Sequence, residues 1–173
     1  MRAQNALQQL ATKLASVIPL NINTWEISTR DLKPGSEDPQ VITEVRSWAA
    51  KNSAFLYYFS VVNNVDLSCV ERVHSDAKDK EKNERAYARL IRCSKCFYVG
   101  GSQNMSQRLR EHLGFGARQT YTLQLAHWAP ALDIELQFTC AKYADDVDAD
   151  VLQALEDDPW VEMGPMFGRK GAR

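Results

Sequence analysis

The sequence lacks the features that mark a secreted, membrane-spanning or disulfide-stapled protein. Four cysteines in 173 residues are too few for a disulfide framework, and no apolar run is long enough to cross a bilayer. The first dozen residues do not resemble a signal peptide, because Arg2, Gln4 and Gln8 interrupt the stretch that would have to be apolar. We therefore expect a reduced, cytoplasmic protein that does not associate with membranes.

The chain also lacks a large charge of either sign. Its formal net charge is −1, so no overall field attracts nucleic acid, and any such contact must come from a local basic patch. No internal repeat or low-complexity tract is present. Apolar residues make up 45% of the chain, which suffices for a packed core, and the length suits one domain with a short extension.

Helix-like and strand-like segments follow one another without regular alternation, which predicts an α+β domain with a small antiparallel sheet. We expect residues 1–52 to form an N-terminal helical extension that packs on the main domain, with helices over 3–18 and 41–51. The main domain, residues 53–173, begins with an apolar and aromatic run at 54–62 that predicts a buried strand.

The remainder of the main domain is expected to begin with a charged helical insertion at about 68–92. The further elements expected are a strand over 95–99 that ends at Gly100 and Gly101, a helix over 103–113, strand or short helical segments over 120–126 and 133–140, and a last helix that begins after an N-cap at Asp148 and stops at Pro159. Strands and helices therefore alternate irregularly to the end of the chain.

Polar side chains of catalytic type occur on four of these elements. The candidate catalytic residues are, in chain order, Tyr57, Tyr98, Arg108, His112 and Glu156. At about 100° per residue, His112 lies within about 20° of Met105 on the helix, and Arg108 within about 60° of it. Both polar groups therefore border the buried face, where a guanidinium and an imidazole are costly unless they are paired.

This set has the chemistry that phosphodiester hydrolysis needs. A carboxylate such as Glu156 can hold one divalent ion, Mg²⁺ or Mn²⁺. The guanidinium of Arg108 can stabilise negative charge on a phosphate in the transition state. A phenol or an imidazole can orient or deprotonate water. Each residue taken singly also has a structural interpretation, as a core aromatic, a surface ion-pair partner, a hydrogen-bonded core histidine or a solvated helix end.

The order and spacing of these residues resemble the GIY-YIG nuclease superfamily. The segments 55–57 (Phe-Leu-Tyr) and 98–100 (Tyr-Val-Gly) are similar to the two strands that give the family its name. In that family an arginine follows ten residues after the second tyrosine, and Arg108 stands ten residues after Tyr98. The likeness covers roughly residues 54–171.

The resemblance implies a three-stranded antiparallel sheet flanked by helices, and hydrolysis with one divalent ion and no covalent intermediate. Tyr98, or Tyr57 with it, would position or deprotonate the attacking water. Arg108 would hold the scissile phosphate. Glu156 matches the family's metal ligand on a later helix, and His112 would assist as a base or by hydrogen bonding, as in restriction-enzyme-like members.

Three positions depart from the family pattern. Phe55 stands at the glycine of the first motif, Gly101 stands where many repair-type members carry lysine, and Gly168 stands where many carry asparagine about twelve residues after the glutamate. Together with the insertion at about 68–92, these departures indicate a divergent branch, restriction-enzyme-like or from bacterial mobile elements, rather than a repair enzyme.

Basic residues outside the catalytic set are candidate phosphate contacts. They are Arg110, Arg118, Arg169 and Lys170. We expect DNA rather than RNA as the substrate, and cleavage of both strands of a duplex would favour a homodimer. Two other functions stay open: a catalytically inert nucleic-acid-binding module that retains the fold, and a zinc-stabilised interaction domain suggested by the C-x-x-C pair Cys93 and Cys96.

Overall fold

The computed structural model describes residues 2–49 and 53–171, and it has the α+β class expected from the sequence. At its centre is a four-stranded sheet of order β1-β4-β2-β3 in which all neighbours are antiparallel. The strands are β1 (Asn21–Ser28), β2 (Ser53–Val61), β3 (Cys96–Ser102) and β4 (Glu135–Ala144). The helices are α1 (Arg2–Ser16), α2 (Gln40–Trp48), α3 (Leu67–Lys80), α4 (Met105–Leu113) and α5 (Ala149–Met163).

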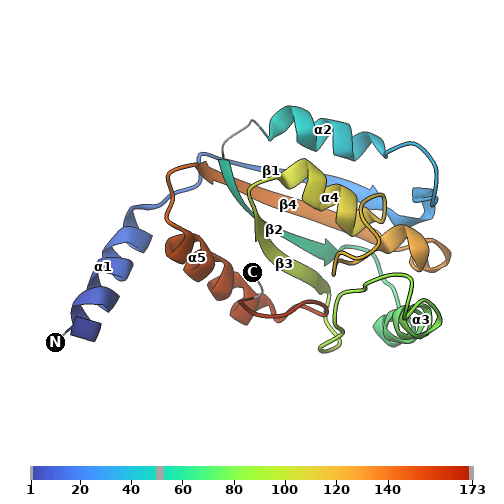
Figure 1. Ribbon diagram of the computed structural model, residues 1–173. Helices are drawn as coiled ribbons and strands as arrows, with labels where there is room; N and C mark the ends of the chain where they lie inside the picture. The colour runs from blue at the N-terminus through green and yellow to red at the C-terminus, as the bar shows by residue number, and fades with distance from the viewer. Residues whose placement is uncertain (1, 50–52, 172–173) are drawn as a thin grey trace.

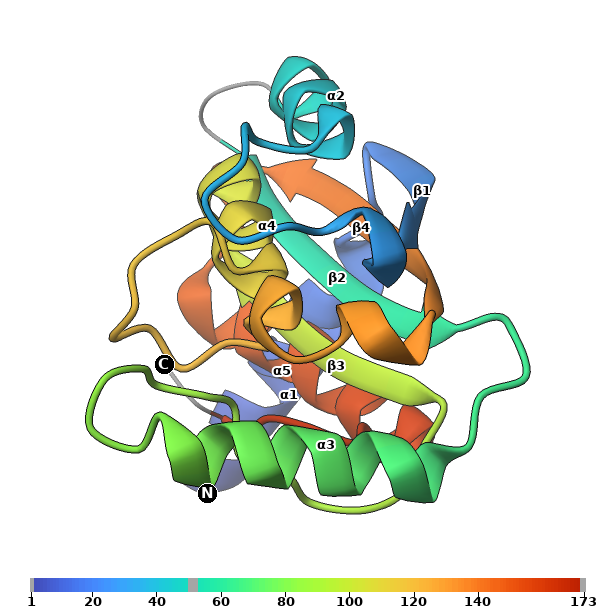
Figure 2. The same cartoon turned by 90° about the vertical axis from the view of Figure 1, so that its right-hand side faces the viewer.

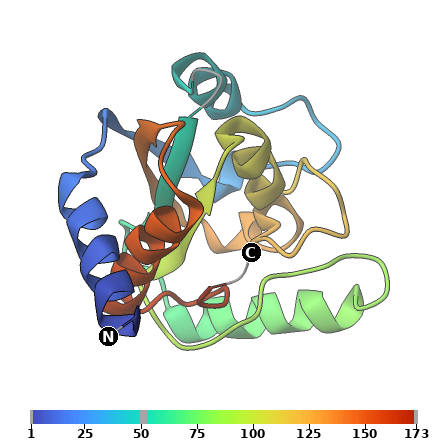
Figure 3. The same cartoon turned by 60° about the vertical axis from the view of Figure 1, so that its left-hand side comes forward.

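Helices cover both faces of the sheet (Figure 1). α2 and α4 pack together on one face, and α5 lies on the other, where α1 runs beside it (Figure 3). α3 runs past the β3 side of the sheet (Figure 2). Within the described residues, no helix is both long enough and apolar enough to span a bilayer.

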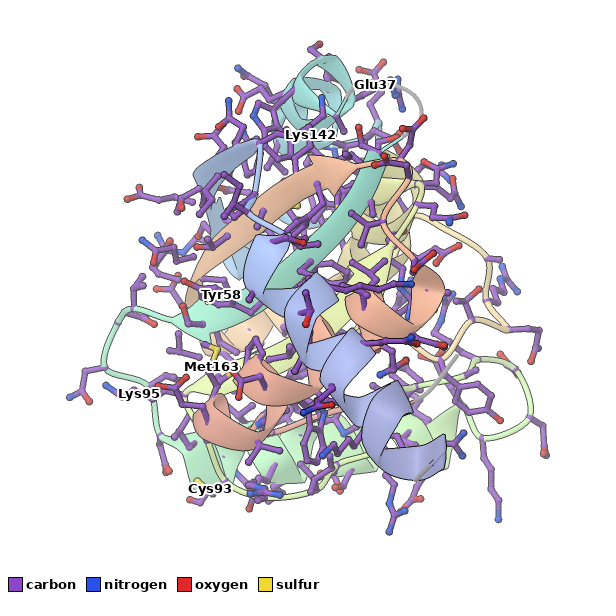
Figure 4. The ribbon with its side chains drawn as sticks, turned by 90° about the vertical axis from the view of Figure 1, so that its left-hand side faces the viewer. Glu37, Tyr58, Cys93, Lys95, Lys142 and Met163 are labelled. Carbon is purple, nitrogen blue, oxygen red and sulfur yellow. The ribbon has the colours of Figure 1, made fainter. Side chains whose placement is uncertain are left out.

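The inner strand β2 divides its side chains between the two faces. Phe55, Tyr57 and Phe59 are buried on the α2/α4 face, where they join the main core together with Phe138 of β4. Tyr58 lies on the opposite face, which looks toward α1 and α5 (Figure 4). Because successive strand residues alternate between faces, an aromatic run such as this one supplies apolar groups to both sides of the sheet at once.

The family resemblance implies a sheet of three strands, and this number is wrong by one. The additional strand, β1, lies inside the N-terminal extension, between the two helices expected there, and it pairs with β4 from Asn21–Lys142 to Ser28–Glu135. Most of its residues are exposed, so β1 carries no buried alternation that would have identified it. The domain boundary expected at residue 52, like the end of the helix expected over 41–51, lies outside the described residues.

Two predicted element ends are also wrong. β3 does not stop at its glycines but continues to Ser102, because Gly100 and Gly101 pair with residues of β2. α5 does not stop at Pro159 but continues to Met163, and it ends at Gly164 in the left-handed conformation. A proline removes one N–H from the helix ladder, and α5 retains the turns on either side of it.

The outer edge of β3 is continued by three short stretches of chain. Backbone N–H groups of residues 166 and 167 donate to β3 carbonyl oxygens at 2.7 and 2.9 Å. Beyond them, the N–H of Gly168 donates to the carbonyl of Arg89 at 2.9 Å, and the N–H of Ala88 donates to the carbonyl of Thr122 at 2.8 Å. We call residues 166–168, 86–91 and 118–122 the edge platform. Its middle stretch belongs to the segment expected as a helical insertion, which is helical only over α3.

α3 buries one histidine among aromatic rings. The ring centroid of His74 lies 5.8 Å from that of Tyr87, 5.2 Å from that of Trp128 and 4.5 Å from that of Phe167. Neither ring nitrogen has a hydrogen-bond partner among the described residues. Burial, with a smaller contribution from the charge of Lys78, lowers the pKa of His74 to about 4. The imidazole is therefore neutral in the folded protein near pH 7.

We expect His74 to make the protein acid-sensitive. Its ordinary pKa is 6.5, so below that pH this histidine is protonated in the unfolded chain, whereas in the folded chain it stays neutral down to about pH 4. Stability contributed by the neutral form is fully present above pH 6.5 and is lost as the pH falls toward 4, by up to about 3 kcal/mol. His74→Leu should reduce the slope of the unfolding free energy against pH, measured by urea unfolding between about pH 4 and 6.5, by the amount that one bound proton contributes. An unchanged slope would contradict the assignment.

Candidate active site

α4 is built to hold two polar residues against the sheet. The side chain of Asn104 accepts a hydrogen bond from the N–H of Gln107 at 3.3 Å and caps the start of the helix. Gly114, with φ at +96°, ends it in the left-handed conformation that favours glycine. Leu109 and Leu113 are fully buried, which fixes the rotation of the helix about its axis. This rotation brings both polar candidates of α4 to the sheet.

The hydroxyl of Tyr57 joins the two polar residues of α4. Its oxygen accepts a hydrogen bond from Nε of Arg108 at 3.1 Å and lies 2.9 Å from Nε2 of His112. The other ring nitrogen of His112, Nδ1, accepts from the backbone N–H of Leu123 at 3.3 Å. In the neutral imidazole the proton must therefore sit on Nε2, which donates to Tyr57. With two donors on its oxygen, Tyr57 has its own hydroxyl proton left to donate to a further group.

Arg108 also connects the second tyrosine to this cluster. Its Nη2 donates to the hydroxyl of Tyr98 at 3.4 Å, and its Nη1 donates to the carboxylate of Glu111 at 3.2 Å. The rings of Tyr57 and Tyr98 are nearly parallel, with centroids 6.1 Å apart and planes inclined by 9°. One guanidinium thus contacts two phenols on neighbouring strands.

Glu156 approaches the same two phenols from α5. It is only 6% exposed, and its charge raises the pKa of both tyrosines. For Tyr57, burial is the main cause of a pKa well above the usual value; Tyr98 adds to the rise, Arg108 opposes it and Glu156 adds to it. Burial likewise raises the pKa of Tyr98. Both phenols therefore carry their protons near neutral pH, and each accepts a hydrogen bond from Arg108.

His112 is fixed in a neutral, hydrogen-bonding role. Burial, and after it the charge of Arg108, lowers its pKa well below the usual value. Both of its ring nitrogens are engaged, Nδ1 by a backbone N–H and Nε2 by Tyr57. Of the two roles expected for this residue, the geometry favours hydrogen bonding that positions Tyr57 over direct action as a base.

The donor set at this site fits a weakly held oxygen-preferring ion. Within the described residues, no three His, Cys, Asp or Glu side chains come together as a metal site. Magnesium, however, commonly binds through one or two carboxylates together with water and the phosphate of a substrate. Glu156 is one such carboxylate, and it lines the same pocket as Tyr57.

Two glycines make room for the tyrosine rings. A Cβ on Gly100 would lie 2.8 Å from Cε1 of Tyr98 and 2.9 Å from the hydroxyl of Tyr57, closer than real contacts allow. Gly168, at the position where the resembled family often has asparagine, has φ at +113°, and a Cβ there would lie 3.1 Å from Tyr98. The ring of Tyr98 therefore takes the space into which a side chain at residue 168 would extend.

The four basic residues expected to bind phosphate differ in their surroundings. Arg110 is held by Asp38, with Nε at 2.9 and 3.0 Å from the two carboxylate oxygens. The Nζ of Lys170 lies 3.9 Å from a carboxylate oxygen of Asp157 on α5. Arg118 and Arg169 are exposed on the edge platform and at its end. Of these residues, Arg169 lines a cavity that reaches Tyr98.

Sequence reasoning missed two residues of that cavity, Arg89 and Tyr121. Arg89 lies in the charged segment expected as an insertion, where it is one of many basic residues. Tyr121 stands between two threonines, and no periodic pattern or motif identifies it as a binding residue. The C-x-x-C pair does not form a metal site in the described part of the chain, since Cys93 is exposed, Cys96 is buried, and both are free thiols. Burial raises the pKa of Cys96 to about 12, so it remains a neutral thiol.

No protein-family model, curated protein or solved structure matches this chain. The functional interpretation consequently depends on the chemistry of the site and on the order of its residues in the sequence.

We expect Gly100→Ala to disturb the site directly. The new methyl group must displace either the ring of Tyr98 or the hydroxyl of Tyr57, which two hydrogen bonds hold in place. Overpacking of this kind costs about 1–3 kcal/mol, to be measured by urea unfolding. Tyr57→Phe removes one of the crowded atoms, so the double variant should lose less stability than the sum of the single ones. A Gly100→Ala protein as stable as the wild type would contradict the crowding.

Proposed function

We propose that this protein is a metal-dependent endonuclease that hydrolyses phosphodiester bonds in nucleic acid, preferentially DNA, in the cytoplasm. Its class would be the GIY-YIG superfamily, as a divergent restriction-enzyme-like or mobile-element branch. The observation that carries the proposal is the hydrogen-bonded contact of Arg108 with Tyr57 and Tyr98, next to the buried carboxylate of Glu156.

Several properties of this cluster support hydrolysis of a phosphodiester. The side chain of Arg108 is 25% exposed while its guanidinium contacts both phenols, which supports binding of a phosphate beside them. Tyr57 and Tyr98 retain protons that they can donate to phosphate oxygens or to the attacking water. His112 holds the hydroxyl of Tyr57 in place through a hydrogen bond from Nε2. A phosphate there would meet three hydrogen-bond donors on one side and a carboxylate on the other.

The reaction adds water across one phosphodiester bond. The water oxygen bonds to phosphorus, the bond from phosphorus to one sugar oxygen breaks, and a proton from water ends on that sugar oxygen. Arg108 stabilises the negative charge that spreads over the phosphate oxygens during this exchange. Tyr98, with Tyr57 beside it, orients the water for attack.

Glu156 is the residue that would hold a divalent ion, Mg²⁺ or Mn²⁺. Bound there, the ion would supply Lewis-acid polarisation of the phosphate and stabilise the leaving oxygen. Cleavage of both strands of a duplex would be served by a homodimer, in which two copies each offer one site.

We expect Arg108→Ala and Glu156→Gln each to lower the cleavage rate at least a hundredfold. Each removes a group whose interaction with the phosphate is strongest in the transition state. The assay uses labelled single-stranded DNA, duplex DNA and RNA, each with Mg²⁺, with Mn²⁺ and with EDTA. Glu162→Gln is the matched control for the carboxylate, because Glu162 lies exposed on the same helix and should leave the rate unchanged.

The outcomes of this assay separate the two candidate functions. Metal-dependent cleavage that both variants lose supports the nuclease. Binding of nucleic acid without cleavage in any buffer would replace it by the inert binding module. Cleavage that survives both substitutions would remove these residues from the reaction. Urea unfolding of each variant shows whether a lost rate reflects a lost fold.

A further inference from the structure

The cavity that Arg169 lines opens beside Tyr98, on the edge platform. Its volume is about 460 Å³, within the range of about 300–1,000 Å³ that is typical of small-ligand sites. The residues that line it are Ala88, Arg89, Tyr98, Tyr121, Gly168 and Arg169. All three stretches of the platform contribute to its wall, and Tyr98 belongs both to this wall and to the cluster around Arg108.

Backbone contacts join the stretches that line this cavity. The N–H of Gly168 donates to the carbonyl of Arg89 at 2.9 Å, and the N–H of Ala88 donates to the carbonyl of Thr122 at 2.8 Å. Tyr87 and Leu90 form bridges to the neighbouring stretches 118–122 and 166–168. The backbone positions from which Arg89, Tyr121 and Gly168 face the cavity are therefore held relative to one another before any ligand binds.

The rim of the cavity has the composition of a site for a nucleic-acid strand. Arg89 and Arg169 are exposed cations, and neither takes part in any ion pair found among the described residues. Tyr121 is an aromatic ring that is 73% exposed. Exposed arginines bind backbone phosphates, and an exposed aromatic ring stacks on an unpaired base whatever its identity.

We propose that the edge platform holds the nucleotide next to the scissile phosphate, with its base unpaired and stacked on Tyr121 and its flanking phosphate bound by Arg89 and Arg169. The substrate class this implies is single-stranded DNA, or duplex DNA that is locally unpaired beside the cut. This inference rests on the proposed function, because Tyr98 joins the cavity to the cluster that would bind the scissile phosphate. The strand runs from Arg108 past Tyr98 into the cavity.

The test measures binding apart from cleavage. Fluorescein-labelled single-stranded DNA and its duplex are titrated with the full chain in EDTA, where metal-dependent cutting is stopped, and anisotropy gives the Kd. Tyr121→Ala should weaken single-strand binding about tenfold and duplex binding much less, because paired bases are already stacked. Tyr121→Phe keeps the ring and should bind as the wild type does.

Arg89 is tested by the salt dependence of the same titration. Arg89→Ala should lower the slope of log Kd against log salt by about 0.7, the value for one phosphate contact on a single strand. Arg30→Ala is the matched control, because Arg30 lies beyond β1 at the other edge of the sheet, where it pairs with Asp133. It should leave both the Kd and the slope unchanged.

An abasic nucleotide tests the stacking itself. When single abasic positions are moved along the oligonucleotide, the one that falls in the cavity should weaken binding to the wild type about tenfold and cause no additional loss with Tyr121→Ala. Equal effects of Tyr121→Ala on single strand and duplex, or an Arg89→Ala slope equal to that of the wild type, would overturn the inference.

The results separate this inference from the proposed function. Cleavage that is lost with Glu156→Gln but unchanged by Tyr121→Ala and Arg89→Ala would support the nuclease and overturn the proposed nucleotide site on the edge platform. Strand binding that depends on Tyr121 and Arg89 without any cleavage would support the platform site and overturn hydrolysis. A protein that binds neither strand nor duplex would overturn both.

Discussion

The hydroxyl oxygen of Tyr57 sets the geometry around which the site is arranged. It is buried on one face of the sheet, and leaving such an oxygen without partners would cost about 1–3 kcal/mol. Both of its partners, Arg108 and His112, come from α4, so the oxygen requires one rotation and one position of that helix. A helix shifted by one residue would turn its side chains by about 100° and break the hydrogen bonds of Tyr57 with Arg108 and His112. The contacts that would bind a phosphate are therefore also contacts that keep α4 in place.

The site also requires residues without side chains next to the two tyrosines. Gly100 and Gly168 border the ring of Tyr98 on two sides, and larger residues there would push it away from Arg108. Where the resembled family often carries an asparagine, this chain instead brings backbone against an aromatic ring. Glycine at residue 168 thus forms part of the wall of the cavity beside Tyr98, which Arg89 and Tyr121 also line.

Much of the inner fold could be predicted from sequence, because its residues interact through periodic patterns. The aromatic run of β2 and the apolar stripe of α4 are buried as expected, and the ten-residue spacing from Tyr98 brings Arg108 to the phenols. β1 could not be predicted, because its backbone ladder with β4 holds it while most of its side chains are exposed. The edge platform escaped prediction for a similar reason: backbone hydrogen bonds between distant segments build it, and every sequence carries those groups. The partner of Arg110, Asp38, likewise comes from a loop that no periodicity places.

The edge platform also has a consequence for how the protein is made. Its inner stretch, residues 166–168, lies almost seventy residues after Tyr98 along the chain, although the two are in contact in the folded protein. On the ribosome, β2, β3 and α4 are all synthesised before that stretch, because they precede it in the sequence. The side of Tyr98 that faces the platform stays open to water until translation has passed Gly168. The wall of the cavity beside Tyr98 is therefore completed only after a stretch far along the chain from Tyr98 has been synthesised.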